Sequence, residues 1–256
     1  MPRPSAHIHE LISAGDAPSA LHNNCSGKHS GFLTVTKHLK AGPEYVEIDH
    51  PLQKAIRAAT EEVTGETVAG YGIDGCSAPN FAMSVAGLAR AMAEFAKARE
   101  GGSVRERAMQ RLRDAMAAHP EYVAGEGRSC TELMRAMGGR VAIKTGAEAV
   151  FIAMIPEKKL GLAMKIEDGN SRASEAVLAA LLALAGLAAL FNAPLTIGEL
   201  RVDVAIAFGV NDEFEGSNAQ RLAAALVAAE QSIRTLGDAR NVSDLANTTI
   251  ALSGGR

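Results

Sequence analysis

From Arg140 onward, the apolar side chains of this chain recur with a period of two, which is typical of β-strands. Residues 140–144, 149–155 and 160–166 fit this pattern, and short turns join them. Strands connected this closely predict an antiparallel meander. A helix expected over residues 171–190 would cover one face of the sheet. The sequence therefore predicts an α+β fold in which helices pack on an antiparallel sheet.

Before residue 140, the apolar residues mostly follow the 3.6-residue period of helices. Helices are expected over residues 6–15, 32–40, 52–63, 84–99, 103–118 and 131–137. Gly15 and Gly65 should end the first and third helices, and Asp49 should cap the start of the third. Residues 68–83 are rich in glycine and predict a loop with a defined backbone path.

The C-terminal part gives weaker signals. Residues 195–210 predict a further strand, and residues 217–236 predict a helix. The last 15 residues show no convincing period, and we expect them to be disordered.

Composition argues against several classes of protein. The 256 residues carry a net charge of −3 and no lysine or arginine run, so no nucleic-acid partner is expected. The longest apolar run, residues 176–191, is too short to span a membrane. Three cysteines are an odd number, which argues against a disulfide framework. The N-terminus lacks an apolar export segment, so we expect a protein of the reducing cytoplasm.

The densest group of reactive side chains lies in residues 22–31, which carry a thiol, an amine, two imidazoles and two hydroxyls. Gly27 and Gly31 allow the backbone to turn tightly and to approach a ligand closely. Because a helix is expected to follow, the N–H groups of its first turn would stabilise a Cys25 thiolate. The alternative interpretation is a polar loop that contains a buried cysteine.

A metal site is one function that these residues could serve. Cys25 and Lys28 lie three positions apart, and Cys76 lies in the second glycine-rich loop. Two thiolates and a third donor can hold Zn²⁺ and leave one position for water. The pattern is not a paired Cys-x-x-Cys motif, and lysine must lose a proton before it can bind a metal.

A second motif, Lys144-Thr145-Gly146, lies at the end of a predicted strand. In penicillin-recognising serine enzymes such a motif borders the active site, while the nucleophile belongs to a Ser-x-x-Lys on a helix. No serine of this chain has a lysine three residues later. Cys130 is interpreted as a core or pocket-wall residue. Residues 167–170 are interpreted as a turn, or else as carboxylates that reach into the site.

Taken together, five separated motifs resemble the asparaginase II family, the rhizobial-type L-asparaginases. They are His22–Gly31, Asp74-Gly75-Cys76, residues 123–128, residues 144–147 and residues 165–170. The resemblance runs in order from about residue 5 to residue 200. It implies a fold similar to serine β-lactamases and glutaminases, with a helical subdomain, and hydrolysis of the side-chain amide of L-asparagine to aspartate and ammonia.

The resemblance also implies roles for single residues. It implies a zinc site in which Cys25, Lys28 and Cys76 are the ligands. Asp74 would contact these ligands without binding the zinc itself. Lys144 matches the strand lysine that helps to activate the nucleophile, as general base or electrostatic stabiliser. The substrate would contact a set of residues from both motifs, namely Asn24, Ser26, His29, Thr145 and Gly146.

The departures from the family are as specific as the matches. Family members carry roughly a hundred further residues before the matching region, and that part supplies the Ser-x-x-Lys pair. We therefore expect residues 1–200 to be an asparaginase II domain without its N-terminal part, with an incomplete sheet and low activity alone. Residues 201–256 are expected to be a C-terminal extension in which no family is recognised, and the incomplete sheet edge is expected to favour a homodimer.

Two other functions compete with this prediction. One is a non-catalytic zinc- or amino-acid-binding protein, or one half of a split enzyme. The other is a cysteine hydrolase in which Cys25 is the nucleophile and His29 or His22 the base. Zinc content distinguishes the cysteine hydrolase from the other functions, because a metal-bound thiolate is not a free nucleophile.

Overall fold

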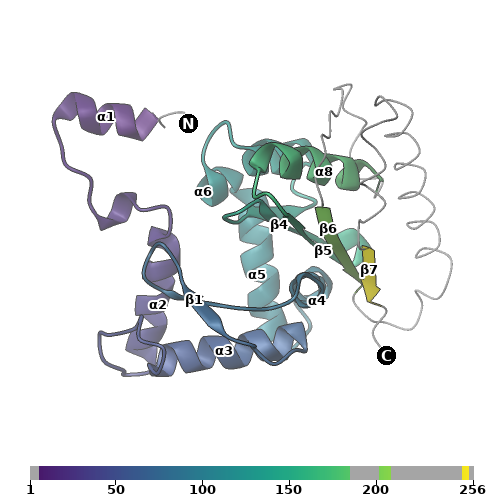
Figure 1. The fold of residues 1–256 in the computed structure, drawn as a ribbon, viewed down its shortest axis with the longest axis horizontal. Helices are drawn as coiled ribbons and strands as arrows, with labels where there is room; N and C mark the ends of the chain where they lie inside the picture. The colour runs from purple at the N-terminus through teal and green to yellow at the C-terminus, as the bar shows by residue number, and fades with distance from the viewer. Residues whose placement is uncertain (1–5, 185–201, 209–249, 254–256) are drawn as a thin grey trace. The chain divides into compact units, whose positions relative to one another are not determined.

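Residues 6–184, 202–208 and 250–253 are described by the structure, which is a computed structural model (Figure 1). The chain divides into two compact units, an N-terminal unit of residues 1–83 and a C-terminal unit of residues 84–256. Within the described ranges, no helix combines the length and apolar character needed to cross a membrane.

From residue 6 to residue 83, the N-terminal unit contains three α-helices, one short 3-10 helix and a β-hairpin. The helices are α1 (Ala6–Ala14), η1 (Ala20–His22), α2 (Ser26–His38) and α3 (Pro51–Thr64). Gly15 and Gly65 follow α1 and α3 with φ angles of +68° and +66°, in the left-handed region that glycine tolerates best. The predicted ends of these two helices are therefore confirmed.

The cap at the start of α3 differs from the prediction. His50, and not Asp49, is the N-cap residue, and its Nδ1 accepts a hydrogen bond of 3.1 Å from the Leu52 N–H. Its Nε2 lies 3.0 Å from the Gly42 carbonyl oxygen. The imidazole thus replaces the usual capping oxygen and fastens the preceding loop to the helix at the same time.

The glycine-rich segment after α3 is a hairpin and not only a loop. Strands β1 (Tyr71–Ile73) and β2 (Pro79–Phe81) pair antiparallel, with Tyr71 opposite Phe81. Both strands have three residues, which is too short for a period of two to be recognised in the sequence. The turn between them carries Asp74 and Cys76.

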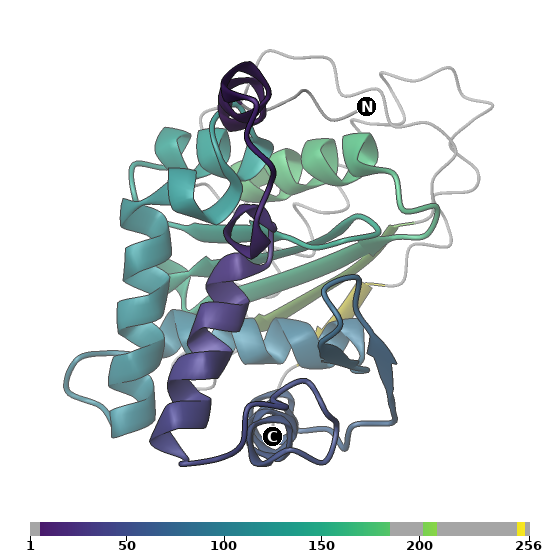
Figure 2. The ribbon, with the colours of Figure 1, turned by 90° about the vertical axis from the view of Figure 1, so that its left-hand side faces the viewer.

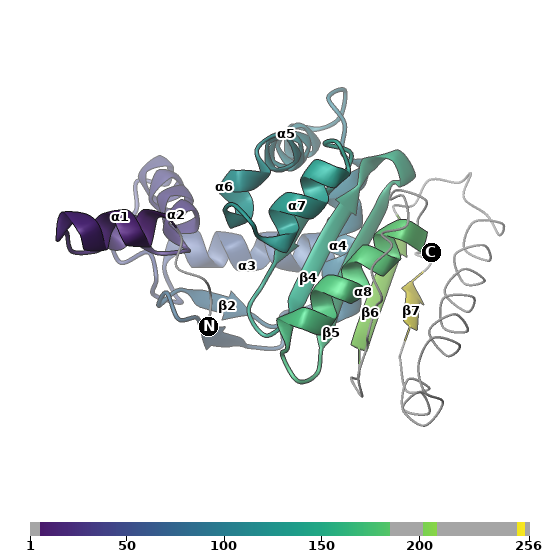
Figure 3. The same cartoon turned by 90° about the horizontal axis from the view of Figure 1, so that it is seen from above.

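The C-terminal unit is built on one five-stranded sheet. Its strands, in spatial order, are β3 (Ala142–Thr145), β4 (Val150–Ile155), β5 (Leu160–Ile166), β6 (Val202–Phe208) and β7 (Ile250–Ser253). Figure 3 shows β4 to β7 side by side. Pairs from β3 to β6 are antiparallel, so the predicted meander and the α+β class are confirmed, whereas β7 pairs parallel to β6.

The end of the chain contains more order than the sequence indicated. Residues 250–253 form β7, so the expectation that the last 15 residues are disordered is wrong for these four. The strand predicted within residues 195–210 is confirmed as β6, which pairs with β5 along its whole length. The helix predicted over residues 217–236 and the domain boundary near residue 200 lie outside the described residues.

Helices cover both faces of the sheet (Figure 2). On one face, α7 (Ser129–Ala136) and α8 (Ser171–Leu184) enclose the main core with Phe151, Leu162 and Met164. On the other face, Ala89 and Ala93 of α4 (Val85–Lys97) pack on Ala163. This second contact is very close, since a Cβ on Gly161 would lie 2.1 Å from the Ala93 nitrogen.

Two further helices belong to the described part of the C-terminal unit. They are α5 (Val104–Ala118), as predicted, and the five-residue α6 (Pro120–Ala124), which lies between the helices predicted over residues 103–118 and 131–137. α5 is mostly exposed but buries Arg113, which is 7% exposed. Its guanidinium donates to the carbonyl oxygens of Phe95, Ala96 and Ala98, at distances of 2.8 to 3.1 Å. Arg113 therefore satisfies the open carbonyls at the end of α4.

Candidate metal centre

Cys25 is the N-cap residue of α2, and the helix begins at Ser26, six positions before the predicted start at Phe32. The Asn23 Oδ1 accepts a hydrogen bond of 2.8 Å from the Cys25 N–H, which fixes the backbone before the helix. The first helical hydrogen bond joins the His29 N–H to the Cys25 carbonyl oxygen. The first residues of α2 are polar or glycine, and its apolar residues begin only at Phe32. The apolar period therefore predicted a helix that starts too late.

The hairpin turn supplies the second group of side chains. The Asp74 N–H donates to the Ala78 carbonyl oxygen at 2.9 Å, and the Ser77 N–H donates to the Asp74 carbonyl oxygen at 2.8 Å. The Asp74 carboxylate accepts a hydrogen bond of 2.7 Å from the Gly75 N–H and one of 3.7 Å from the Cys76 thiol. These bonds hold the side chains of Asp74 and Cys76 on the same side of the turn.

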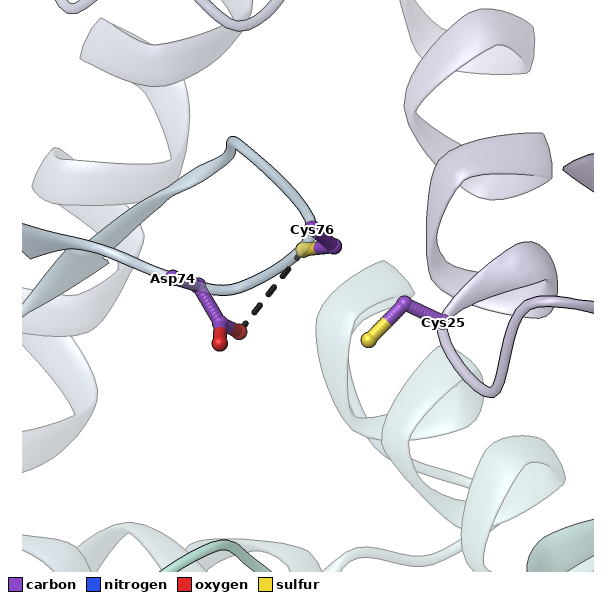
Figure 4. A group of neighbouring side chains, drawn as sticks. All are labelled: Cys25, Asp74 and Cys76. Atoms are coloured by element: carbon purple, nitrogen blue, oxygen red, sulfur yellow. Dashed lines mark hydrogen bonds between the residues drawn. The ribbon is translucent and has the colours of Figure 1, made fainter.

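The two groups meet, as Figure 4 shows. The sulfurs of Cys25 and Cys76 and a carboxylate oxygen of Asp74 all lie within 4.8 Å of one another. The Lys28 Nζ lies 3.2 Å from the Asp74 Oδ2, and both side chains are 37% exposed. The structure thus brings together the predicted donors Cys25, Lys28 and Cys76, and it adds Asp74 as a fourth group that could bind a metal directly.

The charges of this cluster depend on one another. Burial raises the pKa of Cys76, but hydrogen bonds from His29, the Ala78 N–H and Lys28 outweigh it and lower the pKa to about 7. Burial also raises the pKa of Cys25, and its hydrogen bond with Cys76 raises it further. Of the two thiols, Cys76 therefore ionises first, and a substantial fraction of it is thiolate at neutral pH.

The Lys28–Asp74 pair stays charged in the metal-free protein. Hydrogen bonds from Lys28 and from the Gly75 N–H lower the pKa of Asp74. Burial lowers the pKa of Lys28, but hydrogen bonds to Cys76 and Asp74 raise it by more. Lys28 is thus an ammonium that Asp74 holds next to the sulfurs, and it must lose a proton to become a metal ligand.

His29 has an environment that the sequence did not indicate. Its Nδ1 lies 2.8 Å from the Tyr45 hydroxyl, and its ring packs edge-on against Phe32 and Tyr45, with centroid distances of 5.6 Å. The Nε2 atom is buried and makes no hydrogen bond of regular geometry among the described residues. The contact with Tyr45 spans 16 positions, so no local pattern could have found it.

The lysine motif belongs to the C-terminal unit. Lys144 pairs with Ile152 and shares its face of the sheet, which is the face covered by α4. The Lys144 Nζ donates to the Thr145 carbonyl oxygen at 2.7 Å, and the Gly146 N–H donates to the Val150 carbonyl oxygen at 2.7 Å. Lys144 is exposed, so its amine is accessible to a reacting group.

The other candidate residues differ in their exposure and in their hydrogen bonds. Asn24 is exposed and Ser26 is half-buried at the start of α2. The Nδ1 of His22 accepts a hydrogen bond of 2.8 Å from the Ser19 N–H, so this atom is already used. Cys130 is fully buried in the main core, which is the first of the two places predicted for it, the core or a pocket wall. The Asp168 carboxylate accepts a 2.7 Å bond from the Asn170 N–H, which is the geometry of a turn.

Comparison with known proteins adds one match. The family model described as L-asparaginase II matches residues 1–196. No curated protein matches the chain.

Proposed function

Because the chain belongs to the asparaginase II family, we propose that it serves the hydrolysis of L-asparagine to L-aspartate and ammonia. The observation that carries this proposal is the convergence of Cys25, Lys28, Asp74 and Cys76 on one point, within a segment that the family match covers. The match supports an amidohydrolase acting on a small molecule, and the cluster supports the site.

We propose that this cluster holds Zn²⁺ through Cys25, Cys76 and Lys28. Two sulfurs and a nitrogen are donors that zinc prefers. The two sulfurs lie within 4.8 Å of each other and of an Asp74 carboxylate oxygen, and the Lys28 Nζ lies 3.2 Å from the Asp74 Oδ2. Asp74 then holds the Lys28 amine in place and can accept a hydrogen bond from a bound water. When bound, the zinc would supply positive charge that orients an anionic or carbonyl group of the substrate.

Lys144 is the proposed catalytic residue, as general base or as electrostatic stabiliser. Its exposed amine is held at its strand end by the Thr145 carbonyl oxygen. Substrate contacts are proposed for Asn24, Ser26 and His29 in the N-terminal unit and for Thr145 and Gly146 in the C-terminal unit. The N–H groups of the first turn of α2 suit the carboxylate of an amino-acid substrate.

We further propose that the 256-residue chain turns over little L-asparagine by itself. Amide hydrolysis needs a nucleophile that a base activates, and the sequence contains no Ser-x-x-Lys pair. The raised pKa of Cys25 argues against a free cysteine nucleophile there. The other candidate functions, a binding protein or one half of a split enzyme, share the same metal cluster.

Ammonia release tests this proposal. The purified chain should release ammonia from L-asparagine at or near background. Activity should appear when a polypeptide that carries the family's Ser-x-x-Lys pair is added, and Lys144→Ala should then abolish it. Strong ammonia release by the chain alone, retained in Cys25→Ala but lost in Ser26→Ala, would show that the nucleophile has been assigned wrongly.

A further inference from the structure

Two of the three cysteines are placed to react with each other. Cys25 and Cys76 are both partly exposed, and Figure 4 shows them on neighbouring segments, at the start of α2 and in the β1–β2 turn. Their sulfurs lie within 4.8 Å of each other. Because a disulfide bond is about 2.0 Å long, the sulfurs need to approach by less than about 3 Å to form one. Both cysteines belong to the N-terminal unit, so the pair is complete within one compact unit.

A small local movement closes this distance. Cysteine has a single side-chain torsion, and rotation about its Cα–Cβ bond carries the sulfur between staggered positions. The hydrogen bond from the Cys76 thiol to the Asp74 carboxylate spans 3.7 Å, which makes it a weak restraint. Cys76 also lies in a turn between two strands of only three residues, so a short ladder holds the turn. The bond therefore needs no rearrangement of α2.

The third cysteine does not compete for this reaction. Cys130 is 0% exposed and lies in the main core of the C-terminal unit. An oxidant dissolved in water therefore does not reach its sulfur while the protein is folded. Cys25 and Cys76 are the two thiols that such an oxidant meets.

We propose that Cys25 and Cys76 form a reversible disulfide with each other, and that this bond and zinc exclude one another. The bond rests on the placement of the two thiols, while the exclusion rests on the zinc site proposed above. Zinc binds thiolate sulfur, and a sulfur that is bonded to the other cysteine is no longer a thiolate. Oxidation would therefore release the metal, and reduction would restore the site.

The oxidant that we propose is a low-molecular-weight disulfide, such as oxidised glutathione. The thiolate of one cysteine attacks a sulfur of the oxidant, whose S–S bond breaks, and one glutathione leaves as a thiolate. The thiolate of the second cysteine attacks the protein sulfur of this mixed disulfide, and the second glutathione leaves. The Cys25–Cys76 bond has then formed, two electrons have passed to the oxidant, and the two thiol protons end on the two released glutathione molecules.

Thiol counting tests the disulfide. The 256-residue chain, freed of metal by a chelator, is incubated with oxidised glutathione and then denatured, and its thiols are counted. We expect the three thiols of the reduced chain to fall to one, with a loss of two hydrogens from the intact mass and a peptide that joins Cys25 to Cys76. Dithiothreitol should restore all three thiols.

Two variants make the count specific. Cys130→Ala is the matched control, because it removes the buried thiol, and its two remaining thiols should both disappear on oxidation. Cys25→Ser leaves Cys76 without its partner, so this variant should instead retain one glutathione as a stable mixed disulfide.

Zinc competition tests the exclusion. At a free Zn²⁺ concentration about 100 times the dissociation constant, only about 1% of the sites are metal-free, so disulfide formation should slow about 100-fold. Mg²⁺ at the same concentration prefers oxygen ligands and should not slow it. The oxidised chain should lose Zn²⁺ to a chromophoric chelator that the reduced chain resists.

The outcomes separate this inference from the proposed function. If the metal-free wild type keeps three thiols, or gains glutathione on single cysteines without losing two hydrogens, the disulfide is wrong, whatever the zinc content. If the oxidised chain binds Zn²⁺ as tightly as the reduced chain does, the exclusion is wrong. If the disulfide forms but the reduced chain binds no zinc, the proposed metal site is wrong, and the exclusion falls with it while the disulfide stands.

Discussion

At the scale of single residues, the two thiols of the cluster differ in reactivity although they lie close together. Hydrogen bonds lower the pKa of Cys76 to about 7, whereas burial and the bond with Cys76 raise that of Cys25. The hydrogen bond between the two thiols moves their pKa values in opposite directions. The Cys76 thiolate is stabilised because it accepts this bond, and the Cys25 thiol keeps its proton because it donates it. The pair thus presents one anion and one neutral group at neutral pH.

Alkylation of the metal-free protein tests this difference. The thiolate fraction rises as the pH increases through the pKa, so the iodoacetamide reaction of Cys76 should have its midpoint near pH 7. Cys25 should react only at higher pH. In His29→Ala the midpoint of Cys76 should move upward, because the largest lowering influence is lost. Peptide mass spectrometry resolves the two sites, and a faster reaction at Cys25 would contradict the assignment.

At the scale of elements, the strands of the C-terminal unit were predicted from the sequence more accurately than the two segments that carry the cysteine cluster. Residues 140–166 were predicted correctly because large apolar side chains recur at every second position, as Leu162, Met164 and Ile166 do in β5, and the turns between the strands are short. The start of α2 and the β1–β2 hairpin were missed, since their residues are mostly exposed and carry no apolar period. The cluster of Cys25, Lys28 and Cys76 could be named from the sequence, and the structure brings these three side chains together. The contacts of His29 and Tyr45 could not, because only the tertiary fold brings them together.

The buried arginine of α5 gives a prediction at this scale. Arg113→Ala would leave three carbonyl oxygens at the end of α4 without their donor, and we expect a loss of about 2–4 kcal/mol in the free energy of unfolding. Arg111→Ala changes an exposed arginine of the same helix and should cost less than about 0.5 kcal/mol. Urea unfolding measures both, and equal effects would contradict the capping role.

At the scale of the whole molecule, we expect a homodimer, and exposed apolar side chains are where we expect its interface. Large apolar side chains are exposed in the N-terminal unit, with Leu33, Val35 and Leu39 between 41% and 47% exposed. Val35 and Leu39 lie four positions apart at the end of α2 and so share one side of it. We propose that Val35 and Leu39 take part in the expected homodimer, since apolar groups gathered on a surface favour an interface.

Light scattering after size exclusion checks the dimer. The wild-type chain should have twice the mass of the 26.6 kDa monomer. Val35→Lys combined with Leu39→Lys should shift it toward the monomer, because charges would have to be buried in the interface. Val104→Lys, at an exposed apolar position at the start of α5, is the control and should not change the mass. A monomeric wild type would contradict the prediction.

Metal analysis tests the central claim most directly, that Cys25, Lys28 and Cys76 form the zinc site of an asparaginase II protein. We predict about one zinc ion per purified chain, with affinity that falls as the pH drops below neutral, because protons compete for both sulfurs and the amine. Cys76→Ser should lose the metal, and Cys130→Ala, which changes the buried core cysteine, should retain it. A wild-type chain without zinc, or a Cys76→Ser variant with unchanged zinc content, would contradict the account.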